Sequence, residues 1–141
     1  MITETINVRT SQQNELIDIT DTVERCVAKS NIQSGICFVF VPHTTAGITI
    51  NENADPSVRR DIIYELEKVV PVQDNYAHTE GNSAAHIKAS LLGFSVTIFV
   101  EKGHLSLGTW QGIYFAEFDG PRVREAWIKI INSKCQIPNV K

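Results

Sequence analysis

Four histidines are the residues of this chain best suited to chemistry, and all of them lie between positions 43 and 104. They are His43, His78, His86 and His104, and two runs rich in amide and acidic side chains, HTTAGITINENADP and HTEGNSAAH, lie in the same part of the chain. Imidazole, amide and carboxylate groups are costly to bury unless they are paired or bind a metal. Their concentration in a mostly apolar middle section predicts one shared polar site.

Two kinds of site are compatible with these histidines. Three neutral imidazoles bind zinc or a similar divalent ion and leave a fourth position for water or substrate, which is how catalytic zinc centres are built. The alternative is that each histidine caps a helix, bonds a neighbouring carboxylate or lies at the surface, because histidines far apart in sequence rarely bind one ion together. HTEGNSAAH is not the zinc motif HExxH. The residue pattern alone leaves both interpretations open.

Composition and charge restrict the classes of protein. A chain of 141 residues with 43% hydrophobic and 21% charged residues is typical of one globular domain, residues 1–141. The net charge is −3 and no Lys/Arg cluster is long enough to follow a phosphate backbone, so no nucleic-acid partner is expected. The N-terminus does not resemble a signal peptide and no run of 18 apolar residues occurs, so we expect no membrane association and a cytoplasmic location. The three cysteines lack CxxC spacing and are expected to be reduced and buried: Cys26, Cys37 and Cys135.

Hydrophobic periodicity predicts an α+β fold, mostly an antiparallel β-sandwich with a few packed helices. Two strands at 4–9 and 15–19 are expected to form a hairpin through residues 10–14. The apolar run 36–42 predicts a central strand buried on both faces, and 46–52 predicts a second central strand. Three helices are expected. The first is capped by Thr20 or Asp21 and ends near residue 31, and the third is capped by Ser83 and ended by Gly93. The second, at 56–69, is capped by Asp55, and its apolar face consists of Val58, Ile62, Leu66 and Val69. Residues 72–82 predict a loop, and four further strands are expected within 94–102, 104–108, 109–118 and 123–131. No glycine-rich segment has the spacing of a nucleotide-binding loop.

Three motifs carry a resemblance to a known family: HTTAGITINENADPSVRRDI, HTEGNSAAHIKASLLG and GTWQGIYFAEFDGPRVRE. Over residues 4–131 the chain resembles the YjbQ-like family, also called the secondary thiamine-phosphate synthase family. The resemblance implies a sheet-rich α+β fold assembled as a homotrimer, with a metal or anion in a histidine-lined pocket. The thiamine-phosphate activity in the family's name looks weak or secondary.

The resemblance also assigns residues to the pocket. The family's histidines fall on His43, His78 and His86, which become the predicted ligands of a divalent metal such as zinc, whereas His104 matches no histidine of the family pattern and is left out. The family's NENADP, GTWQG and GPR motifs fall on 51–56, 108–112 and 120–122, so these stretches are expected to line the same pocket.

Several polar residues have both a functional and a structural interpretation. Glu80 is the predicted catalytic residue, as a general base or fourth metal ligand, or else a surface loop charge. Asp55 is interpreted as a helix cap rather than as a catalytic residue. Trp110 is expected in the core or at a subunit interface, and Arg122 suits a phosphate or carboxylate, or else forms a salt bridge with Asp119 or Glu125. The predicted substrate-binding residues are Asn51, Glu52, Asn53, Asn82, Gln111 and Arg122, of which the asparagines are equally common in turns.

These observations predict a small metal-binding enzyme that acts on a phosphorylated small molecule. The reaction suggested by the resemblance is a thiamine-phosphate synthase-like transfer, in which a pyrimidine diphosphate is joined to a thiazole phosphate. Displacing diphosphate normally needs Mg²⁺ held by oxygen ligands, whereas three histidines favour zinc, so the ligands and this reaction do not match well. The alternatives are a non-catalytic trimeric protein that binds metal or anions, and metal-assisted hydrolysis of an ester.

Overall fold

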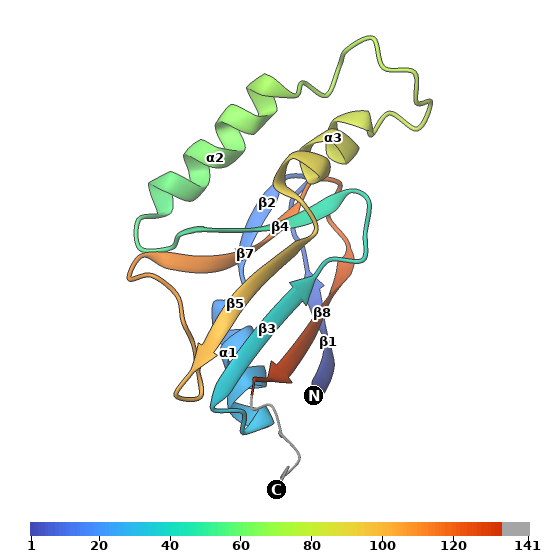
Figure 1. Ribbon diagram of the computed structural model, residues 1–141. Helices are drawn as coiled ribbons and strands as arrows, with labels where there is room; N and C mark the ends of the chain where they lie inside the picture. The colour runs from blue at the N-terminus through green and yellow to red at the C-terminus, as the bar shows by residue number, and fades with distance from the viewer. Residues whose placement is uncertain (134–141) are drawn as a thin grey trace, which may run out of the picture.

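The computed structural model describes residues 1–133, which form two β-sheets and three helices (Figure 1). The larger sheet has five strands in the order β1-β8-β3-β5-β6, and the smaller has three in the order β2-β7-β4; every pairing is antiparallel. The α+β class and the mostly antiparallel sandwich predicted from the sequence are confirmed. The strands are β1 (Ile2–Arg9), β2 (Glu15–Asp18), β3 (Ser34–Phe40), β4 (Ala46–Glu52), β5 (Ser95–Glu101), β6 (His104–Leu105), β7 (Gln111–Glu117) and β8 (Val123–Asn132).

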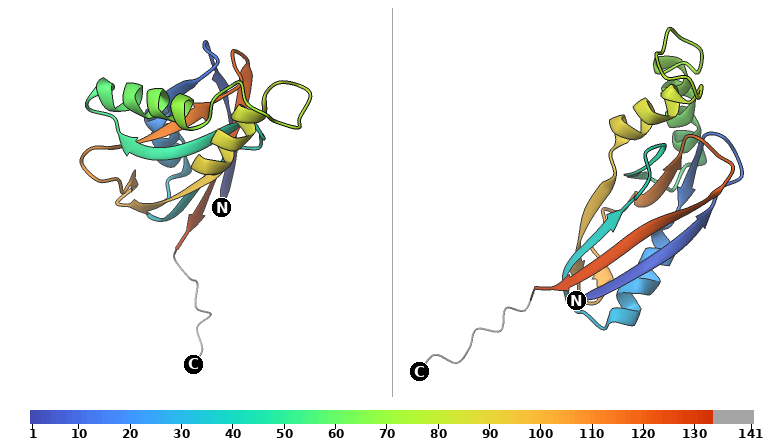
Figure 2. Two further views of the ribbon diagram at one scale, coloured as in Figure 1. Left: turned by 90° about the horizontal axis from the view of Figure 1, so that it is seen from above. Right: turned by 90° about the vertical axis from the view of Figure 1, so that its right-hand side faces the viewer.

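The molecule is layered, and each layer boundary is an apolar core. One core lies between the two sheets and includes residues of helix α1 (Thr20–Ser30), such as Val23 and Val27. A second core lies between the smaller sheet and the helices α2 (Pro56–Val69) and α3 (Ser83–Leu92), around Tyr114 and Phe118. Figure 1 and the right-hand view in Figure 2 show α2 and α3 at one end of the molecule and α1 towards the other. The smaller sheet is therefore covered on both faces.

The expected hairpin between the first two strands is wrong. Both strands form, but β1 pairs with β8 in the larger sheet, whereas β2 pairs with β7 in the smaller one. Residues 10–14 therefore connect two sheets. Alternation of polar and apolar residues shows that a segment has one buried face, but it carries no information about which strand lies beside it.

The expectation that the apolar run 36–42 is buried on both faces is also wrong. In β3, Cys37 and Val39 face the core, while Phe40 is 43% exposed. The strand buried on both faces is β7, because its sheet lies between the larger sheet and the helices: Ile113 and Phe115 enter one core, and Tyr114 enters the other. The strand predicted at 46–52 forms, but β4 is an edge strand rather than a central one.

The helices follow the sequence prediction closely, with differences at their caps. Asp55 caps α2 by accepting a hydrogen bond from the Ser57 N–H at 2.9 Å, as predicted. The caps expected at Thr20 or Asp21 and at Ser83 are each displaced: α1 starts at Thr20 and follows Ile19, and α3 starts at Ser83 and follows Asn82. Gly93 ends α3 as expected, with φ of +93°.

The buried face of α2 also differs from the predicted apolar face. Ile62, Ile63 and Leu66 pack against the core beneath the helix, whereas Val69 is 64% exposed. The helix lies at the outside of the molecule, so its apolar stripe is only partly covered.

Two cysteines confirm the prediction of reduced, buried thiols. Cys26 and Cys37 are free and buried. Burial raises the pKa of Cys26 to about 11, with a further contribution from Glu4, and raises the pKa of Cys37 to about 12. Both thiols are therefore unreactive at neutral pH. Cys135 lies outside the described residues.

The connections between strands bring the polar residues to one end of the molecule. The β3–β4 connection contains His43 and Thr45, and the β7–β8 connection contains Asp119 and Arg122. Thr10 ties the β1–β2 connection to the latter, because its N–H donates to the Arg122 carbonyl at 2.9 Å. Within residues 1–133, no helix is both long enough and apolar enough to cross a membrane.

Candidate functional site

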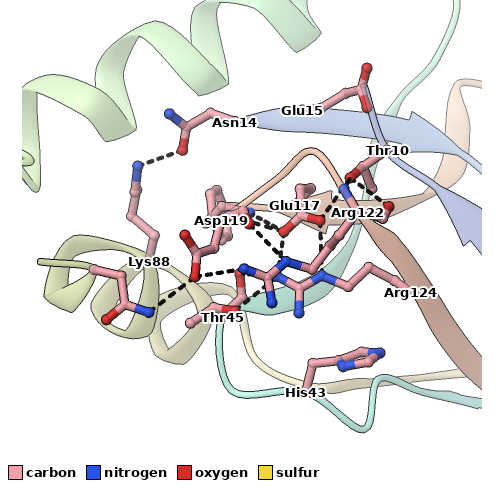
Figure 3. Close-up of polar contacts among 12 residues, drawn as sticks. Thr10, Asn14, Glu15, His43, Thr45, Lys88, Glu117, Asp119, Arg122 and Arg124 are labelled. Carbon is pink, nitrogen blue, oxygen red and sulfur yellow. Dashed lines mark hydrogen bonds and ion pairs between the residues drawn. The ribbon is translucent and has the colours of Figure 1, made fainter. Parts of the chain in front are cut away.

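A polar pocket of about 520 Å³ lies where the β3–β4 and β7–β8 connections meet the N-terminus of α3 and the loop before it. Its lining includes three of the four histidines of the chain together with two arginines and two acidic residues. Figure 3 shows several of these side chains and their polar contacts. The residues that line the pocket are Pro42, His43, Thr44, Thr45, His78, Glu80, Asn82, His86, Asp119, Arg122 and Arg124.

A buried ion pair forms the base of the pocket. Arg124 is 3% exposed and Glu117 is 0% exposed. The guanidinium donates to both carboxylate oxygens, from Nε to Oε1 at 2.8 Å and from Nη2 to Oε2, and Nη2 also donates to the Thr45 hydroxyl at 2.8 Å. A bidentate pair of this kind holds the guanidinium in one orientation. Because it also lines the pocket, Arg124 provides a fixed positive charge there.

Glu117 is held in its ionised form by the groups around it. Burial by itself would raise the pKa of Glu117, but hydrogen bonds from Arg124, from the Asp119 N–H and from the Thr10 hydroxyl outweigh burial and lower it. The Phe118 N–H donates to the same carboxylate at 3.0 Å. The buried carboxylate therefore has the partners that a charge needs away from water.

Arg122 and Asp119 form a second, more accessible pair at the pocket. Arg122 Nε donates to the Asp119 carbonyl at 2.9 Å, and Nη2 lies 3.3 Å from the Asp119 carboxylate. The Arg122 side chain is nevertheless 50% exposed. Asn82 donates from Nδ2 to Asp119 at 3.0 Å, and its Oδ1 is buried without a partner among the described residues. The salt bridge weighed for Arg122 forms with Asp119, and the guanidinium stays accessible from the pocket.

His78, Glu80 and His86 form a second group of side chains that line the pocket. The rings of His78 and His86 meet edge to face, with 5.5 Å between their centroids. His78 Nε2 lies 3.9 Å from the Glu80 carboxylate, and both side chains are well exposed. Such a group is suited to moving protons to and from a bound molecule.

His43 is held differently from the other two histidines. Its Nε2 accepts a hydrogen bond from the backbone N–H of Glu125 in β8 at 3.0 Å. Burial, followed by the nearby charge of Arg124, lowers the pKa of His43 below its ordinary value. The ring is therefore a neutral imidazole at pH 7.

The three predicted metal ligands share one pocket, but their arrangement does not fit a three-histidine metal centre. His43 uses its Nε2 lone pair to accept from Glu125, which places the proton of the neutral ring on Nδ1 and leaves no free nitrogen lone pair. Among residues 1–133, no group of three or more His, Cys, Asp or Glu side chains is placed to hold a metal ion. Metal binding by all three histidines stays a prediction, and it would require His43 to give up its hydrogen bond with the Glu125 N–H.

The predicted substrate-binding residues are divided between two ends of the fold. Asn82 and Arg122 line the pocket, but Asn51 and Glu52 lie at the far end of β4, about 17 and 20 Å along the strand from Ala46 at a rise of about 3.3 Å per residue.

The remaining residues of that group have local partners. Asn53 donates to Asp18 at 3.3 Å, and Gln111 accepts from the Gly108 N–H at 2.8 Å. Trp110, expected in the core or at an interface, is 62% exposed in the single chain. His104 is exposed and lies 3.7 Å from Glu24, away from the pocket.

Thr45, Arg124 and the buried partner Glu117 were not predicted from the sequence, and Asp119 was named only as a salt-bridge partner of Arg122. A signal for two of them was present. In β8, Arg124 alternates in step with Ala126 and Ile128 and so lies on the same buried face of the strand. In β7, Glu117 lies in the same way on the face of Ile113 and Phe115. Opposite charges on the buried faces of two strands indicate a buried ion pair.

A second cavity of about 390 Å³ adjoins the polar pocket. It shares His78 and His86 with the pocket, and its other lining residues are mostly apolar: Tyr76, Ala77, Ser83 and Ile87. A molecule that occupied both spaces would meet charged donors at one end and apolar groups at the other.

Comparisons with known proteins place the chain in a family. Residues 4–133 match the family described as UPF0047 protein YjbQ-like. The chain is 55% identical to UPF0047 protein MJ1081 of Methanocaldococcus jannaschii, over 90% of this chain and 92% of that protein. It is 50% identical to UPF0047 protein YugU of Bacillus subtilis, over 91% and 98%.

Two solved structures have the same fold. An uncharacterised conserved protein of the YjbQ/UPF0047 family from Clostridium acetobutylicum matches with a TM-score of 0.89 and 57% identity, covering 91% of this chain and 99% of that one. A protein of unknown function from Sulfolobus solfataricus matches with a TM-score of 0.90 and 38% identity, covering 94% and 97%. The chain therefore belongs to the UPF0047 (YjbQ-like) family.

Proposed function

We propose that the chain binds a phosphorylated small molecule in the polar pocket and acts on it. The observation that carries this proposal is the pair of arginines at the pocket, one fixed by a buried carboxylate and the other accessible. A guanidinium offers a planar set of donors that matches a phosphate group. Because Glu117 already orients Arg124, little ordering of this donor is needed when a ligand binds.

The adjoining cavity suggests the rest of the ligand. A phosphate held at Arg122 and Arg124 would leave the other end of the molecule beside His78, His86 and the apolar side chains of the second cavity. Ligand sites commonly combine a few polar groups that fix orientation with apolar walls. We therefore favour a phosphorylated molecule that carries a ring or another compact apolar group.

Catalysis is assigned to the histidine side of the pocket. In the transfer proposed here, Glu80, with His78 beside it, takes a proton from the amino group of the pyrimidine as the carbon–oxygen bond to diphosphate breaks, and returns it when the thiazole nitrogen forms the new bond through its lone pair. The arginines stabilise the negative charge of the departing diphosphate. The specific reaction we propose is a thiamine-phosphate synthase-like transfer, carried out in the cytoplasm. A divalent metal such as zinc remains part of the proposal, but no step here depends on it.

The second candidate function is non-catalytic binding of anions or metal. It is supported by the ionised, structurally fixed Arg124–Glu117 pair. This pair can hold an anion whether or not the protein catalyses a reaction. The two candidates differ in whether Glu80 matters for a reaction.

Replacing Arg122 with alanine tests the anion site. We expect Arg122→Ala to weaken binding of inorganic phosphate about 10- to 100-fold, because it removes charge-assisted hydrogen bonds of roughly 1.5–3 kcal/mol. Isothermal titration calorimetry at low salt gives the dissociation constant. Arg60→Ala is the matched control, because Arg60 is exposed on α2 and lies outside the polar pocket. Equal weakening in both variants would attribute binding to net charge and contradict the proposed site.

A homotrimer is the second part of the proposal. The outer face of the larger sheet carries exposed apolar side chains, and Figure 2 shows no helix over β1, β8 and β3 in its right-hand view. Phe40 and Trp127 contact each other on this face, with 5.7 Å between ring centroids. Such patches mark interfaces. We expect light scattering at micromolar concentration to give three times the monomer mass; the monomer mass would contradict the trimer.

A further inference from the structure

The surroundings of His43 determine which of its nitrogens carries the proton. Nε2 faces the backbone N–H of Glu125 at 3.0 Å, and a backbone N–H is always a donor. Nε2 must therefore be the acceptor, so in the neutral ring the proton is on Nδ1. An imidazole in this state offers one N–H to a ligand and has no lone pair left for a metal.

A second donor lies close to this ring. Arg124 binds Glu117 and Thr45 through Nε and Nη2, and none of the hydrogen bonds of residues 1–133 uses its Nη1. Both His43 and Arg124 line the pocket, and Arg124 is near enough for its charge to act on the imidazole. Each donor is fixed by a partner outside the pocket, His43 by the β8 backbone and Arg124 by Glu117.

We infer that His43 is a neutral hydrogen-bond donor that, together with Arg124, holds the anionic group of the ligand, and that it is not a metal ligand. The inference rests on the proposed function, and it divides the three histidines. His43 belongs to the phosphate end of the pocket, whereas His78 and His86 remain for proton transfer or for a metal.

The tautomer of His43 is the first test, and it needs no ligand. Nitrogen-15 NMR of the labelled wild-type protein distinguishes a protonated from an unprotonated ring nitrogen, and His43→Gln assigns the signals. We expect Nδ1 to be protonated and Nε2 unprotonated at pH 7.5. A neutral ring with its proton on Nε2 would overturn the inference without affecting the proposed function.

Phosphate binding by two variants is the second test. His43→Ala removes the donor, and we expect inorganic phosphate to bind roughly 10- to 100-fold more weakly, as for loss of a hydrogen bond to a charged group. His43→Asn places an amide N–H near the position of Nδ1 and should recover most of that loss, although asparagine does not serve as an imidazole ligand for zinc. Equal weakening in both variants would contradict a donor role.

Zinc titration of the same proteins separates His43 from the other histidines. We expect zinc alone to bind His43→Ala as it binds the wild type, and any zinc affinity to fall in His78→Ala and His86→Ala. A loss of zinc binding in both His43 variants would make His43 a ligand and overturn the inference. If the wild-type protein does not bind phosphate, the proposed function and this inference both fail. If wild type and His43→Ala bind phosphate with the same dissociation constant, only the inference fails.

Discussion

Replacing Arg124 with alanine should destabilise the protein by about 3–5 kcal/mol, the largest loss of stability that we expect from a single change at the pocket. The substitution leaves the carboxylate of Glu117, which is 0% exposed, without its bidentate partner. Thr10 and two backbone N–H groups still donate to the carboxylate, but its counter-charge is lost. Urea unfolding at pH 7 measures the change in the free energy of unfolding.

Two controls separate this burial effect from loss of charge or volume. Arg122→Ala removes the same charge from an accessible ion pair, and we expect it to cost at most about 1 kcal/mol. The double variant Arg124→Met with Glu117→Gln removes both charges but keeps a side-chain oxygen that accepts from Thr10 or the two backbone N–H groups, and it should recover part of the lost stability. A loss in Arg124→Ala no larger than that in Arg122→Ala would show that Glu117 does not depend on Arg124.

The same ion pair gives the wild-type protein a defined response to acid. Because the pKa of Glu117 is lowered on folding, its ionisation adds stability above the ordinary glutamate pKa of about 4.3. That stability is lost as the pH falls through the lower pKa of the folded state. Urea unfolding of the wild type and of Glu117→Gln, at neutral and at acidic pH, measures the free energy of unfolding of each protein. We expect the pH-dependent contribution of Glu117 in the wild type only.

Replacing Glu80 with glutamine should slow turnover of a phosphorylated substrate by about 10²–10⁴-fold, the contribution typical of a general base. Glutamine keeps the size and hydrogen-bonding reach of the side chain but cannot accept a proton. The Glu80 side chain is 71% exposed, so the substitution should leave stability almost unchanged. The assay uses the phosphorylated compound that stabilises the wild type most against heat.

An exposed glutamate elsewhere serves as the control for this substitution. Glu65 lies on α2 and has a long contact of 3.8 Å to Lys68, so Glu65→Gln removes the same charge from a residue that does not line the pocket. We expect it to leave turnover unchanged. Full turnover in Glu80→Gln would remove its role as a base, whereas an absence of turnover in the wild type with intact phosphate binding would favour the non-catalytic candidate.

Local patterns in the sequence were sufficient to predict most of the elements. Asp55 followed by Pro56 sets the start of α2, and Gly93 ends α3, because caps and backbone restrictions act over a few residues. Strand positions such as those of β5 and β8 were equally accessible, since a strand with one buried face alternates in polarity. These features need no knowledge of distant parts of the chain.

Strand pairing, in contrast, was decided by the tertiary structure. The separation of β1 and β2 into different sheets follows from their pairing with β8 and β7, each more than 90 residues away in sequence. Phe40 is exposed because it lies on the outer face of the larger sheet, and β7 is buried on both faces because the smaller sheet lies between the larger sheet and the helices. Such pairings depend on packing of complete faces, and neighbouring residues do not specify them.

The candidate site shows the same division. The sequence by itself, with its three family motifs, determined the family and named His43, His78, Glu80 and His86, and the structure places all four around one pocket. Only the tertiary structure decided that the Asn51 end of β4 lies elsewhere, that Arg124 is fixed by a buried carboxylate, and that His43 accepts from the β8 backbone. Residue types set which chemistry is available, but hydrogen bonds between distant segments set which atom of each side chain is free to perform it.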